Sequence, residues 1–270
     1  MTVLQIFWLS VLQGITEFLP VSSSGHLILF AKFTNFSDQG LAMDVAVHVG
    51  SILAVMIYFA RDIWKILCGL LKTYFLPSFA NEGSKLFWLV IIASIPAAVV
   101  GLLLNNYGVD WLRDTKIIGW NILIFGILMW FADRYSLSVR KIENIEVVDA
   151  LLIGCAQCLA LVPGTSRSGI TITMSRFLGI ERREAAKFCM LLSIPTIAGA
   201  GVLVAYELIK TGSNEFDFAL LGVLFSFMAS IIAIWAMMSW LKNRTFLPFV
   251  IYRIVLGIFL LLYSYEVLPF

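Results

Sequence analysis

The stretch "PVSSSGH" at residues 20–26 interrupts an apolar region that otherwise extends from residue 2 to residue 34. Proline lacks a backbone N–H donor and glycine and serine favour turns, so one straight helix through this stretch is not expected. A second apolar region, 147–180, is interrupted in the same way by "PGTSRSGIT" at 163–171. Each region therefore predicts two helices joined by a polar turn, with both ends of the pair on the same side.

The composition indicates an integral membrane protein. Hydrophobic residues make up 60% of the 270 residues, charged residues only 13%, and the mean hydropathy is +0.94. Soluble domains carry about 25% charged residues, because their surfaces face water. The net charge of +2 and the lack of a basic run exclude a nucleic-acid partner. The cysteines lie in or beside apolar runs and are expected to be buried, inert thiols: Cys68, Cys155, Cys158 and Cys189.

Six further stretches approach the roughly 20 apolar residues that a membrane-spanning helix needs. They are 45–60, 86–104, 117–132, 188–208, 217–241 and 247–264. In a membrane, irregular backbone is tolerated only where protein buries it or where it lines a cavity. The fold class predicted is an all-α membrane protein with six membrane-spanning helices and two re-entrant helical hairpins, in one polytopic domain over residues 1–270.

The basic residues predict which segments face the cytoplasm. Most of the 19 Lys and Arg residues lie in 61–85, 133–149, 176–187 and 242–246. The positive-inside rule assigns these four segments to the cytoplasmic side. With six crossings, both termini then face outward. If either interrupted region crossed the membrane completely, this charge bias would be lost.

The two halves of the chain, about 1–132 and 133–270, also resemble each other. At an offset of 144 residues, Gln13 aligns with Gln157, and Ser22 and Gly25 align with Ser166 and Gly169. Each hairpin is followed by three crossings, so the two halves would have opposite orientations. Inverted repeats of this kind bring their broken elements together near the bilayer midplane. Both polar segments are therefore expected in one shared pocket.

The first polar segment carries an acid and an imidazole. Gln13 and Glu17 are four residues apart and share one face of a helix. An intramembrane carboxylate usually faces a cavity or a partner, so Glu17 is interpreted as a metal ligand, a general base or a proton relay, the alternative being a protonated structural residue. His26 follows three serines in what is expected to be irregular backbone, where imidazole can serve as nucleophile, acid or base. His48 is interpreted as a core residue.

The second polar segment has the chemistry of an anion-binding loop. Gly164 and Gly169 allow backbone N–H groups to turn toward a ligand, and Arg167 offers a planar fork that matches phosphate oxygens. The helix expected to begin near residue 170 adds the positive end of its dipole. Hydroxyl donors are supplied by Ser166, Ser168 and Thr171. The alternative is that Arg167 only pairs with Glu17. Together the two segments predict a site for a phosphate carried by a lipid.

The segments "QGITEFLPVSSSGH" (13–26) and "PGTSRSGIT" (163–171) resemble the two signature segments of the bacitracin-resistance type of undecaprenyl-diphosphate phosphatases. "MDVAVHVGSILAV" (43–55) and "FLPFVIYR" (246–253) also resemble stretches of this family, so the likeness covers essentially the whole chain. It implies hydrolysis of undecaprenyl diphosphate to the monophosphate and phosphate, which recycles the lipid carrier for peptidoglycan synthesis. It also implies a divalent cation, Mg²⁺ or Ca²⁺, and an active site on the outer face of a bacterial plasma membrane.

The resemblance implies a role for each site residue. Glu17 would bind the metal or activate a nucleophile, with Gln13 as its partner, although a glutamine at position 13 weakens any scheme that needs two carboxylates. The nucleophile would be either Ser23, with His26 as its base, or His26 itself. The predicted substrate-binding residues are Gln13, Ser22, Ser24, Gly164, Ser166, Ser168 and Thr171, and Arg167 would hold the diphosphate.

The sequence also bears on two other functions and on two further residues. Broken helices in an inverted repeat are typical of transporters, so a transporter or flippase of polyprenyl phosphates is the alternative to an enzyme. The phosphatidic-acid type of lipid phosphatase is disfavoured, because its later motif requires histidine where this chain has Thr173. Arg253, inside the last span, is expected to have a structural role, and Asp44 would cap a helix or support the cation. A homo-oligomer is compatible with the sequence.

Overall fold

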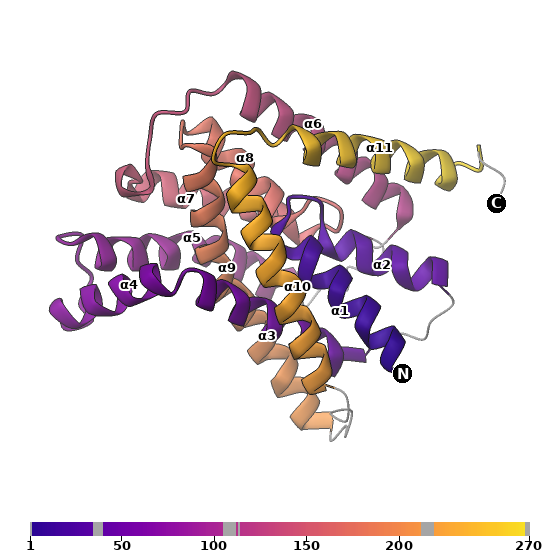
Figure 1. Cartoon of the computed structure of the whole chain (residues 1–270), viewed down its shortest axis with the longest axis horizontal. Coiled ribbons are helices and arrows are strands. Elements are labelled where there is room, and N and C mark those ends of the chain that lie inside the picture. Colours follow the sequence, from indigo (N-terminus) through magenta and orange to yellow (C-terminus); the bar gives the residue numbers. More distant parts are fainter. Residues whose placement is uncertain (1, 35–39, 105–111, 113, 212–218, 268–270) are drawn as a thin grey trace.

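The computed structural model describes residues 2–34, 40–104, 112, 114–211 and 219–267, and in these residues the regular structure is helical apart from one isolated bridge between Arg140 and Ile180 (Figure 1). The α-helices are α1 Val3–Phe18, α2 Ser23–Thr34, α3 Gly40–Tyr58, α4 Ala60–Lys72, α5 Glu82–Leu104, α6 Thr115–Tyr135, α7 Val147–Gln157, α8 Arg167–Phe177, α9 Arg182–Thr211, α10 Ala219–Trp240 and α11 Leu247–Ser264. Two 3₁₀ helices, η2 Ile142–Asn144 and η3 Cys158–Leu161, flank α7. The predicted all-α class is confirmed.

Within the described residues, four helices are long and apolar enough to cross a membrane, namely α5, α6, α10 and α11. A fifth crossing is obtained if the bent pair α3 and α4 counts as one span. The two helices of this pair meet at Phe59 with a bend of 80°. Residues 61–72, expected to belong to a cytoplasmic connection, are therefore helical. All six predicted spans correspond to helices, since 188–208 lies within α9 and 45–60 overlaps α3.

Both apolar regions that the sequence predicts to be interrupted are broken. The first ends its opening helix at Phe18 and begins the next at Ser23, and α1 packs against α2. The second is divided into α7, η3 and α8, with the turn at 162–166. Two details differ from expectation. His26 lies in the first turns of α2 rather than in irregular backbone, and α8 begins at Arg167 rather than near residue 170.

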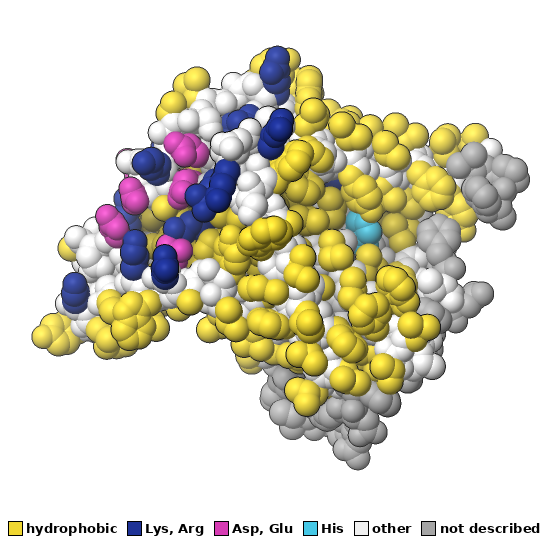
Figure 2. All heavy atoms as spheres, in the orientation of Figure 1, with side chains coloured by type: hydrophobic (Ala, Val, Ile, Leu, Met, Phe, Trp, Pro, Cys, Tyr) yellow, Lys and Arg dark blue, Asp and Glu magenta, His cyan; other side chains and the backbone are white. Residues whose placement is uncertain are grey.

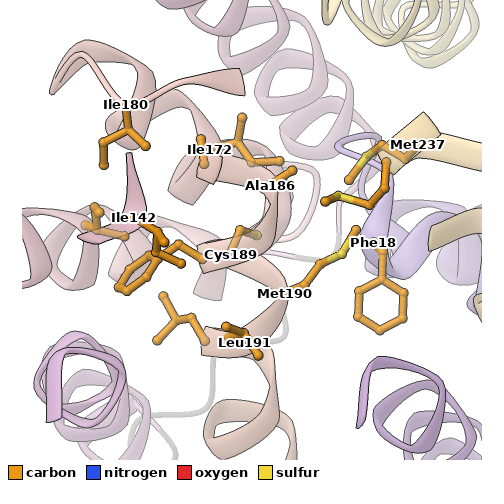
Figure 3. Packing of buried hydrophobic residues seen from close by; sticks show 14 of the residues in the cluster. Phe18, Ile142, Ile172, Ile180, Ala186, Cys189, Met190, Leu191 and Met237 are labelled. Carbon is orange, nitrogen blue, oxygen red and sulfur yellow. The ribbon is translucent and has the colours of Figure 1, made fainter. Parts of the chain in front are cut away.

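Helix α9 occupies the centre of the main hydrophobic core (Figure 3). Its residues Ala186, Cys189, Met190 and Leu191 are at most 4% exposed. Side chains from four other parts of the chain surround them: Phe18 of α1, Ile172 of α8, Met237 of α10 and Ile142 of η2 (Figure 3). Because Phe18 directly precedes the first break, this core fixes the end of α1 relative to α8 and α9. All four cysteines are free thiols, but only Cys189 is buried as expected, whereas Cys68 and Cys158 are partly exposed and Cys155 is exposed.

Helix α10 lies against α1 and α3 through small residues. A methyl group added at Gly14 would come within 2.7 Å of the carbonyl oxygen of Ser226, and one added at Gly50 within 2.3 Å of that of Val223. The Ser226 hydroxyl donates to the carbonyl of Val47 at 2.6 Å. Close backbone approach with serine hydrogen bonds is a common way for helices to associate in lipid. This packing fixes α1, which carries the first site residues.

The four basic segments predicted to share one membrane side lie together, at what is here called the charged end: residues 61–85, 133–149, 176–187 and 242–246. Figure 2 shows the charged side chains gathered at one end of a largely hydrophobic surface. Side-chain contacts join the segments: Lys187 pairs with Asp62, Lys85 donates to the carbonyl of Glu143, and Arg182 pairs with Asp133. The second oxygen of Asp133 accepts the N–H of Phe246 at 3.1 Å.

Ion pairs hold the loops of the charged end in place. Asp133 accepts from Arg182 at 2.6 Å and pairs with the fully buried Arg176 at 3.3 Å. Arg140 forms two hydrogen bonds with Asp149, and this contact raises the pKa of the Arg140 guanidinium. Since removal of one partner leaves a buried charge uncompensated, such pairs strongly favour the observed arrangement over one that breaks them.

Candidate active site

The carboxylate of Glu17 is the centre of the candidate site. One oxygen, Oε1, accepts from Arg167 Nη2 at 2.7 Å. The other, Oε2, accepts from Ser23 Oγ at 2.6 Å and from Gln13 Nε2 at 2.8 Å. The residue is only 7% exposed. Because Ser23 Oγ donates directly to Glu17 Oε2, the carboxylate is placed to act as a base toward this hydroxyl.

The local fold explains how three distant sequence positions meet at Glu17. Gln13 and Glu17 are one helical turn apart on α1, so their side chains lie on one face. The chain then reverses at 19–22, and Ser23 begins α2 beside the end of α1. Arg167 begins α8, which reaches α1 from the other broken region. The structure therefore brings the two polar segments together, as the sequence predicts.

The two turns have matching geometry. Ser22 and Ser166 both have positive φ values, 78° and 72°, which are uncommon for residues other than glycine. The hydroxyl of Ser22 accepts the N–H of Gly25 at 3.3 Å, and that of Ser166 accepts the N–H of Gly169 at 3.0 Å. Each serine thus caps the helix that follows it. The first N–H groups of a helix have no partner within that helix, so α2 and α8 both offer donors to an anion.

Arg167 is oriented by two partners on different helices. Besides Glu17, its guanidinium donates to Thr196 Oγ1 of α9 at 2.9 Å. The residue is not fully enclosed, since 18% of its side chain is exposed. The sequence left open whether Arg167 only pairs with Glu17 or also binds phosphate; the pairing is present, and the planar fork retains further N–H donors.

The hydroxyls near Arg167 hold the loop together in this structure. Ser168 Oγ donates to the carbonyl of Leu19 at 3.0 Å, and Thr171 Oγ1 donates to the carbonyl of Arg167 at 2.8 Å. Ser166 Oγ caps α8, as described above. Ser24 is exposed, with its hydroxyl 3.4 Å from that of Ser22. Direct contact of these hydroxyls with substrate stays a prediction.

His26 contacts neither Ser23 nor Glu17 through any hydrogen bond of the described residues. Its Nδ1 lies 2.7 Å from the carbonyl oxygen of Ser22, so this nitrogen carries the hydrogen in the neutral ring. Its Nε2 then accepts from the hydroxyl of Tyr252 at 2.6 Å, and the two rings stack at 5.7 Å. The base closest to Ser23 is therefore Glu17, whereas the sequence favoured His26 in that role.

Arg253 of α11 forms hydrogen bonds with both turns. It is fully buried and, in the described part of the chain, its guanidinium donates only to backbone carbonyls. Three of these belong to the turns: Pro20 at 3.3 Å, Gly164 at 3.1 Å and Thr165 at 2.9 Å. The others, Ile122 and Asn121, are in α6. The expected structural role of Arg253 is thus the alignment of both loops.

Sequence reasoning missed three neighbours of the site: Tyr252, Thr196 and His48. His48, interpreted as a core residue, is one-third exposed, and its Nε2 lies 4.0 Å from Glu17 Oε2. Its Nδ1 lies 2.6 Å from the carbonyl oxygen of Asp44. A histidine inside an apolar span was the available signal. No spacing rule could have revealed Tyr252 or Thr196, which approach the site only through tertiary packing.

The donor atoms around Glu17 suit a hard divalent cation. Gln13 donates its amide N–H to Glu17, which leaves its carbonyl oxygen Oε1 buried and without a hydrogen-bond partner. That oxygen, the Glu17 carboxylate and Ser23 Oγ are all oxygen ligands. Mg²⁺ typically binds through one or two carboxylates together with substrate phosphates. Within the described residues no group of three or more His, Cys, Asp or Glu side chains is placed to hold a metal ion.

Comparisons with known proteins show the family of this chain. A family model described as bacitracin resistance protein BacA matches residues 6–259. An undecaprenyl-diphosphatase of Hahella chejuensis is 46% identical over 98% of this chain and 99% of its own length. One of Alteromonas mediterranea is 44% identical over 97% of this chain and 98% of its own length. With matches over nearly the full length of both chains, this protein belongs to the BacA family of bacitracin resistance proteins.

Proposed function

We propose that this protein hydrolyses undecaprenyl diphosphate to undecaprenyl phosphate and inorganic phosphate. The observation that carries the proposal is the contact of Ser23, Arg167 and Gln13 with one buried carboxylate, Glu17. Membership of the BacA family and the names of its relatives support the same reaction. The reaction returns the lipid carrier to peptidoglycan synthesis, and resistance to bacitracin is an attribute of the family.

In the proposed mechanism Ser23 is the nucleophile and Glu17 its base. The Ser23 proton passes to Glu17 Oε2, 2.6 Å away, as Oγ forms a bond to the terminal phosphorus. The bond from phosphorus to the bridging oxygen breaks, and undecaprenyl phosphate leaves as an anion. Water then displaces Ser23 from phosphorus, and the serine oxygen regains the proton from Glu17. His26 as the nucleophile remains the alternative, with Nε2 as the attacking atom.

Charge on the transferred phosphoryl group would be stabilised by three fixed elements. Arg167 supplies a positive charge, and the first turns of α2 and α8 supply N–H donors. A bound Mg²⁺ or Ca²⁺, held by Glu17 and Gln13 Oε1, would supply further neutralisation of phosphate oxygens. Because Glu17 and Arg253 fix both turns before substrate arrives, these donors need little reorganisation during the reaction.

Phosphate release from undecaprenyl diphosphate by the purified protein tests this function. We expect release that depends on Mg²⁺ or Ca²⁺ and that falls at least about 100-fold in Glu17→Gln and Arg167→Ala. Matched control variants are Glu143→Gln and Arg244→Ala, which alter exposed residues of the charged end. Tight lipid binding without any phosphate release would instead favour the transporter or flippase.

The position of the phosphate in a trapped intermediate distinguishes the two nucleophiles. An acid-stable phosphoryl group on Ser23, located by mass spectrometry, would support the mechanism above. An acid-labile adduct on His26 would reverse the roles of the two residues. Release without any adduct would indicate direct attack by water.

The same proposal includes a membrane arrangement: six crossings, two re-entrant hairpins from opposite sides, an inverted repeat, and a site that opens to the outer face of a bacterial plasma membrane. Its support is the shared charged end and the matching geometry of the turns at Ser22 and Ser166. In a cysteine-free protein in sealed cells, an impermeant thiol reagent should label Ser24→Cys from outside and Lys242→Cys only after lysis. The reverse pattern would invert the orientation.

A further inference from the structure

Helix α4, Ala60–Lys72, presents three different faces around its circumference. One face is buried and carries Gly69 and Leu70. A second face exposes Trp64, Leu67 and Leu71, with 67%, 46% and 63% of their surface accessible. The three are spaced at i, i+3 and i+7, so they form one stripe. The third face is basic.

The basic face borders the apolar stripe. Arg61, Lys65 and Lys72 are all exposed. They are spaced at i, i+4 and i+11, so they project from one side of the helix, adjacent to Trp64 and Leu71. The acidic residue of the helix, Asp62, is paired with Lys187 of α9 and does not offset this charge. Three cations therefore lie beside an apolar stripe with no acidic residue of α4 left to balance them.

Close contacts fix the orientation of α4. It leaves α3 at an angle of 80°, so if α3 crosses the membrane, α4 lies close to the membrane plane. At Gly83 of α5 an added methyl group would approach the carbonyl oxygen of Lys65 to 2.1 Å, which shows how tightly the two helices meet. With α4 held in this way, its apolar stripe and basic face cannot rotate into the protein.

The segment after α4 extends the apolar surface. Tyr74, Phe75, Leu76 and Phe79 are all between 48% and 85% exposed. Aromatic residues are enriched at membrane–water interfaces, where their rings lie at the level of the headgroups. Figure 2 shows hydrophobic side chains beside basic ones at the charged end of the molecule.

We propose that α4 and residues 73–79 form a binding surface for anionic phospholipids. Trp64, Leu67 and Leu71 would enter the acyl region, and Arg61, Lys65 and Lys72 would contact lipid phosphates. Amphipathic helices with basic residues on the polar face bind anionic membranes in this way. The surface is separate from the catalytic residues, so the inference does not depend on the proposed reaction.

Quenching of Trp64 fluorescence by brominated lipids tests the proposal. The protein is reconstituted in bilayers of phosphatidylcholine and phosphatidylglycerol, with bromine on the chains of one lipid at a time. The contribution of Trp64 is obtained as the difference between the unaltered protein and Trp64→Phe. We expect quenching by both lipids and a preference for phosphatidylglycerol, up to roughly fivefold for each basic residue that contacts a phosphate.

Two sets of variants separate the basic face from general charge. Arg61→Gln, Lys65→Gln and Lys72→Gln combined should abolish the preference while quenching persists, because the apolar stripe is intact. Lys242→Gln and Arg244→Gln combined remove charge elsewhere at the charged end and should leave the preference unchanged. Equal quenching by both lipids in the unaltered protein would overturn the proposal. An absence of quenching by either lipid would also overturn it. Cross-links between copies at Leu71→Cys would then show that a second copy covers this face.

Discussion

At the scale of single residues, the candidate site depends on which donor reaches which oxygen of Glu17. Arg167 occupies Oε1, while Ser23 and Gln13 share Oε2. Ser24, the neighbour of Ser23, is exposed and its hydroxyl lies near that of Ser22 instead. The Ser23 hydroxyl is therefore hydrogen-bonded to a carboxylate that can act as its base, whereas the hydroxyl of the next residue, Ser24, is not.

This difference predicts unequal effects of two alanine substitutions. Ser23→Ala should lower kcat at least about 100-fold, because it removes the hydroxyl held by Glu17. Ser24→Ala should cost less than about tenfold, since that hydroxyl has no basic partner. Phosphate release and thermal unfolding are measured for both variants. Equal losses of activity in the two would contradict the assignment of Ser23.

Arg253 gives a second prediction at this scale. Arg253→Lys keeps the charge, but the single ammonium group has fewer N–H donors than the guanidinium and lacks its planar fork. It therefore cannot reach the carbonyls of both turns at once. We expect a loss of about 2–4 kcal/mol of stability, from buried carbonyls left unsatisfied, together with lower activity. Arg244→Lys, at an exposed site over the ring of Trp240, serves as the control. A melting temperature unchanged by Arg253→Lys would show that the turns do not depend on the guanidinium.

At the scale of elements, the second turn depends on a backbone conformation that only glycine adopts easily. Gly164 has a φ of +92°, and a methyl group there would lie 2.6 Å from the carbonyl oxygen of Ile118. Two independent constraints, dihedral strain and steric overlap with α6 backbone, thus act at the residue whose own carbonyl accepts from Arg253.

Gly164→Ala is therefore expected to destabilise the protein by at least about 1–3 kcal/mol and to reduce phosphate release. The matched control is Gly199→Ala in α9, where nothing lies within 4 Å of an added methyl group. Alanine there should be neutral or stabilising by about 0.5–1 kcal/mol, as usual in a helix. Thermal unfolding in detergent distinguishes the two; similar melting temperatures would rule out a strained turn at Gly164.

At the scale of the whole molecule, Asp133 connects the ends of four helices. It lies near the end of α6, pairs with Arg176 of α8 and Arg182 of α9, and accepts the N–H of Phe246, which precedes α11. Loss of its charge would leave two guanidinium groups without a carboxylate at the charged end. The arrangement of the two broken regions relative to α9 and α11 would then lose one of its fixed points.

Asp133→Asn should accordingly lower stability by about 3–5 kcal/mol, the usual cost of breaking a buried pair from one side. Asp114→Asn provides the control, because asparagine caps a helix as well as aspartate and Asp114 is exposed. The melting temperatures of both variants are compared with that of the unaltered protein. A shift for Asp133→Asn no larger than that for Asp114→Asn would show that the cluster contributes little.

The sequence by itself determined the helical membrane class, the six apolar segments, both breaks and the gathering of the basic segments at one end of the molecule. It could do so because burial in lipid, proline and glycine chemistry and charge bias act on local stretches of chain. It also singled out Glu17 and Arg167 as candidate site residues, since polar residues in apolar surroundings stand out, and the family resemblance added Ser23. Only the tertiary structure decided that Ser23 contacts Glu17 rather than His26, that Tyr252 and His48 border the site, and that α4 turns away from α3. These depend on directions and distances between segments far apart in the chain, which no local pattern specifies.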